Sequence, residues 1–106
     1  MEKRFEVPKN TPKDVLNKIG SQVQTFYKLV MGDFSIRGLT GEISLRESLE
    51  DIANACKIHC ENYHPELGNF ALKYNANKGM IALDTDRNNP AKDRLEKALS
   101  YAISSA

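Results

Sequence analysis

The sequence predicts an α+β fold with a mainly antiparallel sheet, element order β-α-β-β-α-β-β-α, and helices packed on the sheet. Three segments repeat apolar residues at steps of three and four, which is the period of a helix. Two further segments have short apolar stretches on either side of a glycine-containing turn, which is typical of β-hairpins. A length of 106 residues without internal repeats fits one domain spanning residues 1–106.

The N-terminal part predicts a strand and a long helix. Residues 3–7 (KRFEV) alternate in polarity and form the strand. Thr11 and Pro12 are typical of a helix start, and the helix runs to Met31 with the apolar stripe Leu16, Ile19, Val23, Phe26 and Val30. Further apolar residues make this stripe wider than one sheet face needs, which indicates contact with a second helix or a partner subunit. Gly20 within it indicates close packing.

The central part predicts a hairpin over residues 33–45 with its turn at Thr40-Gly41. A second helix follows. Ser44 and Glu47 fit the capping box that satisfies the first backbone donors of a helix. Pro65 ends this helix after about His64.

The C-terminal part predicts a second hairpin and a final helix. The strands are residues 70–74 and 80–85, joined by the turn sequence NANKG. An asparagine cap at 88–89 and Pro90 at the first helical position begin the helix. Its apolar face is formed by Ala91, Leu95, Ala98, Leu99, Ala102 and Ile103.

Composition excludes several classes of function. The 15 basic and 14 acidic residues give a net charge of +1, which argues against nucleic acid as a partner. No apolar run is long enough to span a membrane. Two cysteines without an export signal favour a cytoplasmic location. Glycine-rich phosphate-binding motifs are missing, so we expect neither a cofactor nor an enzyme.

The stretch CKIHCENYHPE, residues 56–66, contains both cysteines and both histidines. Cys56, Cys60 and His64 follow at steps of four, so they could hold zinc, with a fourth ligand from a carboxylate or a second copy of the chain. Cys60 could also be a nucleophile with His64 as its base. Helical phase favours the simplest interpretation, in which the stretch continues one buried line formed by Leu45, Leu49, Ile52, Cys56, His59 and Tyr63.

The function predicted from these patterns is a small non-enzymatic protein-binding module, such as an inhibitor, adaptor or regulatory subunit. It would act through an apolar helix or sheet surface on an unidentified protein partner, and the chain would be a homo-oligomer. Leu29 at the fringe of the first helix and Ile58 on the polar face of the second are the predicted interaction residues. The alternative is a small-molecule or zinc-binding sensor that uses the helix face from Cys56 to His64.

Overall fold

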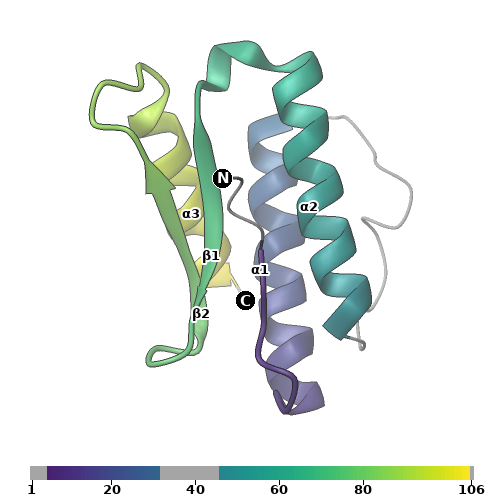
Figure 1. The fold of residues 1–106 in the computed structure, drawn as a ribbon. Helices are drawn as coiled ribbons and strands as arrows, with labels where there is room; N and C mark the ends of the chain where they lie inside the picture. The colour runs from purple at the N-terminus through teal and green to yellow at the C-terminus, as the bar shows by residue number, and fades with distance from the viewer. Residues whose placement is uncertain (1–4, 32–45, 106) are drawn as a thin grey trace.

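The computed structural model describes residues 5–31 and 46–105. Within these ranges the chain forms three α-helices and a two-stranded antiparallel sheet (Figure 1). In chain order the elements are α1 (Lys13–Met31), α2 (Arg46–Tyr63), the short 3₁₀ helix η1 (Pro65–Leu67), β1 (Phe70–Asn75), β2 (Met80–Thr85) and α3 (Lys92–Ser105). The α+β class is therefore confirmed.

The predicted order β-α-β-β-α-β-β-α is wrong, since the described residues have the order α-α-β-β-α. Part of the difference lies at Phe5–Val7, where a strand was predicted. The N–H of Phe5 is donated to Asn54 Oδ1, and that of Val7 to Glu50 Oε2, both on α2. This segment therefore docks on a helix through side chains instead of pairing with a strand. The hairpin predicted at 33–45, with its capping residue Ser44, lies outside the described residues.

Helix α1 is the centre of the fold, because it contacts α2, α3 and β2 (Figure 1). The predicted stripe is buried, and so is Gly20. Phe26, Tyr27 and Phe70 of β1 form an aromatic cluster with ring centroids 5.1–6.5 Å apart, which joins the helix to the hairpin. The width of the stripe is thus explained by contacts within the chain.

The buried face of α2 differs in phase from the predicted one. Its buried residues are Leu49, Ala53, Cys56 and Cys60. Tyr63 is 70% exposed, and its ring stacks on that of His59 with centroids 4.6 Å apart. The prediction followed the large side chains, whereas three of the four buried residues of α2 are the small Ala53, Cys56 and Cys60.

The hairpin has one apolar face and one polar face. Leu72 pairs with Leu83, and Tyr74 with Ile81, so these side chains point to the helices. On the other face Lys73 Nζ lies 3.2 Å from Asp84 Oδ2. Helix α3 returns antiparallel to β2 and packs against both β2 and α1. An isolated two-stranded sheet is marginally stable, so this helical layer is what holds the hairpin.

Asn89 connects four segments at one end of the hairpin. Its Nδ2 donates to Leu67 O at 2.9 Å and to Thr85 Oγ1 at 3.0 Å, with a longer contact of 3.4 Å to Asn69 O. Its Oδ1 accepts the N–H of Ala91 at 2.9 Å, as a capping asparagine does, although α3 begins at Lys92, two residues after the predicted first position Pro90. Gly68 has φ +70°, and a Cβ there would lie 2.6 Å from Asn89 Oδ1. The close approach of these two residues therefore requires glycine.

We predict that Asn89→Ala lowers the free energy of unfolding by about 2–4 kcal/mol, because it removes a helix cap and leaves the buried carbonyl of Leu67 unpaired. Asn89→Asp retains the capping oxygen but turns a second oxygen towards that carbonyl, so it destabilises as well. The control is Asn88→Ala at the exposed neighbour, with an expected change below about 0.5 kcal/mol. Urea denaturation measures all three, and equal values for Asn88→Ala and Asn89→Ala would contradict the role of Asn89.

Candidate functional site

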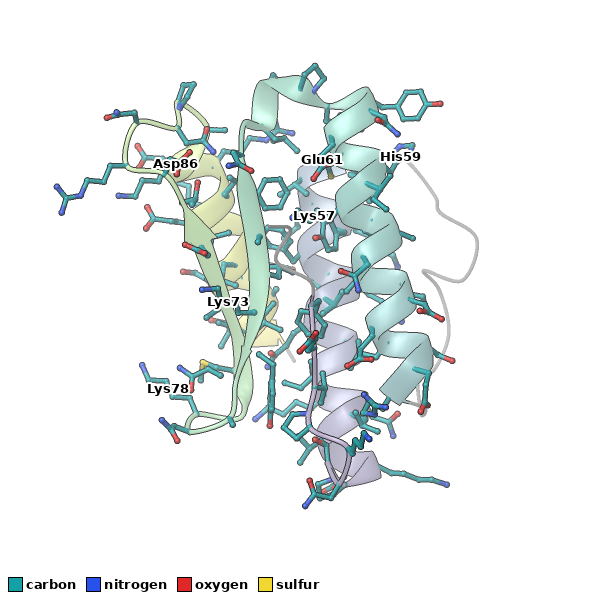
Figure 2. All side chains as sticks on the ribbon, viewed as in Figure 1. Lys57, His59, Glu61, Lys73, Lys78 and Asp86 are labelled. Carbon is teal, nitrogen blue, oxygen red and sulfur yellow. The ribbon has the colours of Figure 1, made fainter. Side chains whose placement is uncertain are left out.

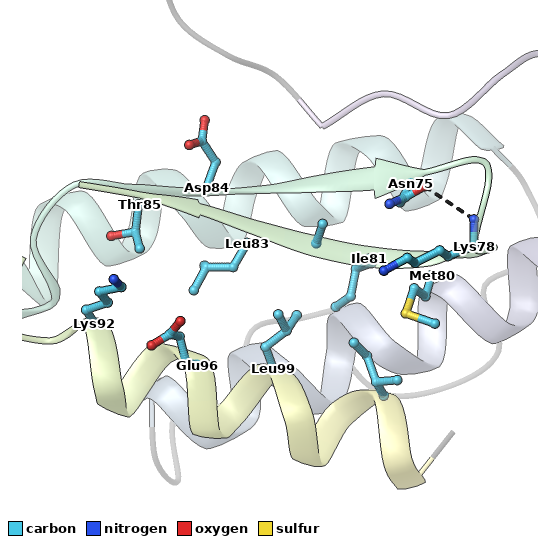
Figure 3. A pocket seen from close by; sticks show the side chains of 12 residues that line it. Asn75, Lys78, Met80, Ile81, Leu83, Asp84, Thr85, Lys92, Glu96 and Leu99 are labelled. Carbon is cyan, nitrogen blue, oxygen red and sulfur yellow. Dashed lines mark hydrogen bonds between the residues drawn. The ribbon is translucent and has the colours of Figure 1, made fainter. Parts of the chain in front are cut away.

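A groove runs between β2 and α3, with a volume of about 400 Å³ (Figure 3). All six residues of β2 line it, together with Asn75 and Lys78 at the hairpin turn and four residues of α3, namely Lys92, Glu96, Leu99 and Ile103. We call it the β2–α3 groove. Because α3 runs antiparallel to β2, Lys92 lies at the Thr85 end and Leu99 lies closer to the turn end (Figure 3).

The groove follows the outer edge of β2. Leu83 and Asp84 point to opposite faces of the hairpin (Figure 3), yet both line the groove. A cavity on one face would be lined by alternate residues only. In the described part of the chain β2 pairs with β1 alone, so its other edge is the one that borders the groove.

The backbone of β2 shows which part of this edge is open. The N–H of Ile81 is donated to Gln22 Oε1 of α1 at 3.0 Å, so it points away from β1. Backbone groups two residues apart in a strand point the same way, which places the N–H groups of Leu83 and Thr85 on the outer edge too. Neither N–H has a hydrogen-bond partner among residues 5–31 and 46–105. Within residues 5–31 and 46–105, helix α1 therefore closes the edge at Ile81, and no described element covers it from Leu83 to Thr85.

The floor of the groove is apolar and its rim is charged. Leu83, Leu99 and Ile103 are partly buried against the core and supply the floor. Of the lining charges, Asp84 is paired with Lys73. Lys78, Lys92 and Glu96 form no ion pair within the described ranges. An apolar floor with cations near both ends suits a segment that carries both apolar and acidic groups.

The predicted metal ligands do not converge on one point. Cys56 and Cys60 are buried in the core, and His64 Nδ1 lies 3.4 Å from Glu66 Oε1. In the part of the chain that the structure describes, no three Cys, His, Asp or Glu side chains are placed to hold a metal ion. A site completed by a second copy stays a prediction, which elemental analysis of the purified protein tests.

Both thiols are held in their neutral form. Burial raises the pKa of Cys56 to about 12, with a further contribution from Cys60. Burial also raises the pKa of Cys60 to about 12, and the carboxylates of Glu66 and Glu61 add to the effect. A nucleophilic or metal-binding cysteine needs a lowered pKa, so this environment does not support the nucleophile alternative for Cys60.

The two predicted interaction residues lie outside the groove. Leu29 of α1 is 44% exposed and Ile58 of α2 is 57% exposed, whereas the groove is built from β2, α3 and the turn. Their role stays a prediction. Sequence reasoning missed Lys78, Lys92 and Glu96, which carried no motif. The sequence offered one signal of the groove wall. Gln22 lies next to the stripe residue Val23, and in the structure its side-chain amide is fully buried and holds the N–H of Ile81.

The described helices include none that is long and apolar enough to cross a membrane. Comparison with known proteins finds no match to a family model, a curated protein or a solved structure.

We predict that Cys56 and Cys60 of the native protein react slowly with Ellman's reagent at pH 8, where about one thiol in ten thousand is ionised at a pKa of about 12. A moderate rise in pH, within the range where circular dichroism shows the native fold, speeds the reaction, because the thiolate fraction grows with pH below the raised pKa. In denaturant both thiols react within seconds to minutes, which provides the control. Fast labelling of the native protein at pH 8 would show that the thiols are accessible and ionised.

Proposed function

We propose that the chain is a small non-enzymatic protein-binding module whose partner occupies the β2–α3 groove. The observation that carries the proposal is the combination of an apolar floor with a strand edge whose N–H groups at Leu83 and Thr85 have no partner in the described residues. Buried apolar contact supplies affinity at protein interfaces, and unpaired backbone donors supply a direction for pairing. Inhibitor, adaptor and regulatory subunit all remain compatible roles.

The positions of the buried ionisable groups support a binding role over a catalytic one. In the described part of the chain, buried side chains with raised pKa include Tyr27, Cys56 and Cys60, which lie in the core where α1 meets α2. None of them lines the groove. Catalytic sites bring such groups into the cavity that holds the substrate, and this cavity is instead lined by a strand, aliphatic side chains and solvated charges.

We predict that Leu99→Glu weakens partner binding at least about tenfold, because it puts a charge on the groove floor. The measurement is capture of proteins from extracts of the source cells on the immobilised chain, quantified by mass spectrometry. Ile58→Glu is the matched control, since it adds the same charge to an exposed helix position outside the groove. Circular dichroism verifies that both variants fold.

The expected result is a protein retained by wild type and by Ile58→Glu but lost with Leu99→Glu. A protein that Leu99→Glu retains but Ile58→Glu loses would place the partner on the α2 surface around Ile58. If wild type retained no protein above the level of an uncoupled resin, the binding function itself would be wrong.

We also propose that the chain forms a homodimer through the exposed apolar residues Leu29 and Ile58. Sedimentation velocity over a wide concentration range is expected to show a monomer–dimer equilibrium that the double variant Leu29→Glu, Ile58→Glu shifts to monomer, since two buried like charges oppose association. A strict monomer at all concentrations of wild type would remove this proposal and leave the groove unaffected.

A further inference from the structure

We propose that the partner binds as an extended segment that adds antiparallel to the outer edge of β2. Apolar side chains of this segment enter the β2–α3 groove, and an acidic side chain that follows them reaches Lys78. The inference rests on the proposed binding function and specifies its mode and the chemistry of the partner.

The first argument is the unpaired backbone of β2. The edge presents the N–H groups of Leu83 and Thr85 without partners in the described chain, beside a groove lined by both faces of the strand. A strand that adds to an edge satisfies such groups through main-chain hydrogen bonds, while its alternate side chains enter the neighbouring pocket. Here the pocket wall is α3, with Leu99 facing β2 (Figure 3).

The second argument excludes a copy of the same chain from this edge. Two copies of β2 could pair antiparallel about a two-fold axis in several registers. The registers that place Leu83 opposite Leu83 or opposite Ile81 need the N–H of Ile81 as a donor, and Gln22 already holds that N–H. The remaining register within β2 pairs Leu83 with Thr85 and puts Asp84 opposite Asp84 at the axis. Like charges directly opposite each other destabilise a strand pair, so a segment of another protein is the better occupant.

The third argument is the charge at the turn end of the groove. Asn75 Oδ1 accepts the N–H of Asn77 at 3.1 Å and that of Lys78 at 3.3 Å, which fixes the turn and with it the position of Lys78 (Figures 2 and 3). At the opposite end Lys92 and Glu96 carry opposite charges one helical turn apart on α3, so the net charge of that end is zero although no ion pair joins them in the described residues. Among the described residues, Lys78 is therefore the lining charge without an opposite charge near it, and this position favours an acidic group on the partner.

The direction of the added strand orders the partner's sequence. Antiparallel pairing is the more stable kind, so the segment begins near Thr85 and ends near the turn. The N–H of Ile81 is held by Gln22, so the paired part of the segment lies beside Leu83 to Thr85, roughly 10 Å at about 3.4 Å per residue. The partner motif is thus about three residues that pair beside Leu83 and Thr85, then a short stretch with apolar side chains that follows the groove past Ile81 without pairing, and then one or two acidic residues near Lys78.

Synthetic peptides test this mode directly. The probe is acetyl-Val-Thr-Val-Thr-Val-Glu-Glu-amide, and the matched control replaces both glutamates with lysines. A third peptide replaces the central valine with proline, which cannot donate to the strand edge. Binding to the full chain is followed by nitrogen-15 NMR, with hydrogen exchange of the amides of Leu83 and Thr85 as the readout of strand pairing.

The expected result is saturable binding of the glutamate peptide, slowed exchange at Leu83 and Thr85, and affinity about two- to fivefold above that of the lysine peptide at low salt. Lys78→Glu reverses this preference, whereas Lys97→Glu, on α3 outside the groove, leaves it unchanged. The proline peptide binds more weakly than the probe.

Three results would overturn the proposal. The first is binding that leaves the exchange of both amides unchanged, and the second is equal affinity for the glutamate and lysine peptides. The third is concentration-dependent protection of Leu83 without any peptide, which would identify a second copy as the occupant. If Leu99→Glu fails to capture the partner and one of these three results is also obtained, the groove remains the binding site but strand addition is rejected.

Discussion

The contact between Asn89 and Gly68 fixes the geometry on which the groove depends. One amide side chain donates to Leu67 O and to Thr85 Oγ1, and it accepts the N–H of Ala91. The end of β2 and the start of α3 are thereby held by the same group, so the two walls of the groove are joined at this end. Glycine at position 68 is what lets this side chain lie against the backbone.

Helix α1 also fixes both walls of the groove, β2 and α3, through contacts that do not involve Asn89. Arg94 of α3 donates to Val30 O near the end of α1 at 2.9 Å, where a cation also meets the negative end of the helix dipole. Gln22 of α1 holds the N–H of Ile81 in β2. Each wall therefore has its own polar tie to the central helix in addition to apolar packing, and the groove is built on elements that are held in place without a ligand.

The sequence predicted what local chemistry decides. The hairpin, the capping contact of Asn89 and the end of α2 before Pro65 depend on neighbouring residues and agree with the structure; the bounds of β2 match, and β1 is one residue longer than predicted. The face of α2 was out of phase because burial of Cys60 in place of Tyr63 depends on which side of the helix meets α1. The groove could not be predicted, since Lys78, Leu83 and Leu99 come together only through the return of α3 along β2.

An exposed strand edge is a risk for aggregation, and the structure limits that risk without closing the edge. Gln22 occupies the donor at Ile81, which removes the turn half of β2 from pairing. The ion pair of Asp84 with Lys73 puts charge on the outer face of the half that stays open. A long, flat sheet partner would meet both obstacles, whereas a short segment entering beside Leu83 and Thr85 would avoid them. The same two features that oppose self-association therefore leave room for a segment of defined length and register, which is the property that a specific binding site requires.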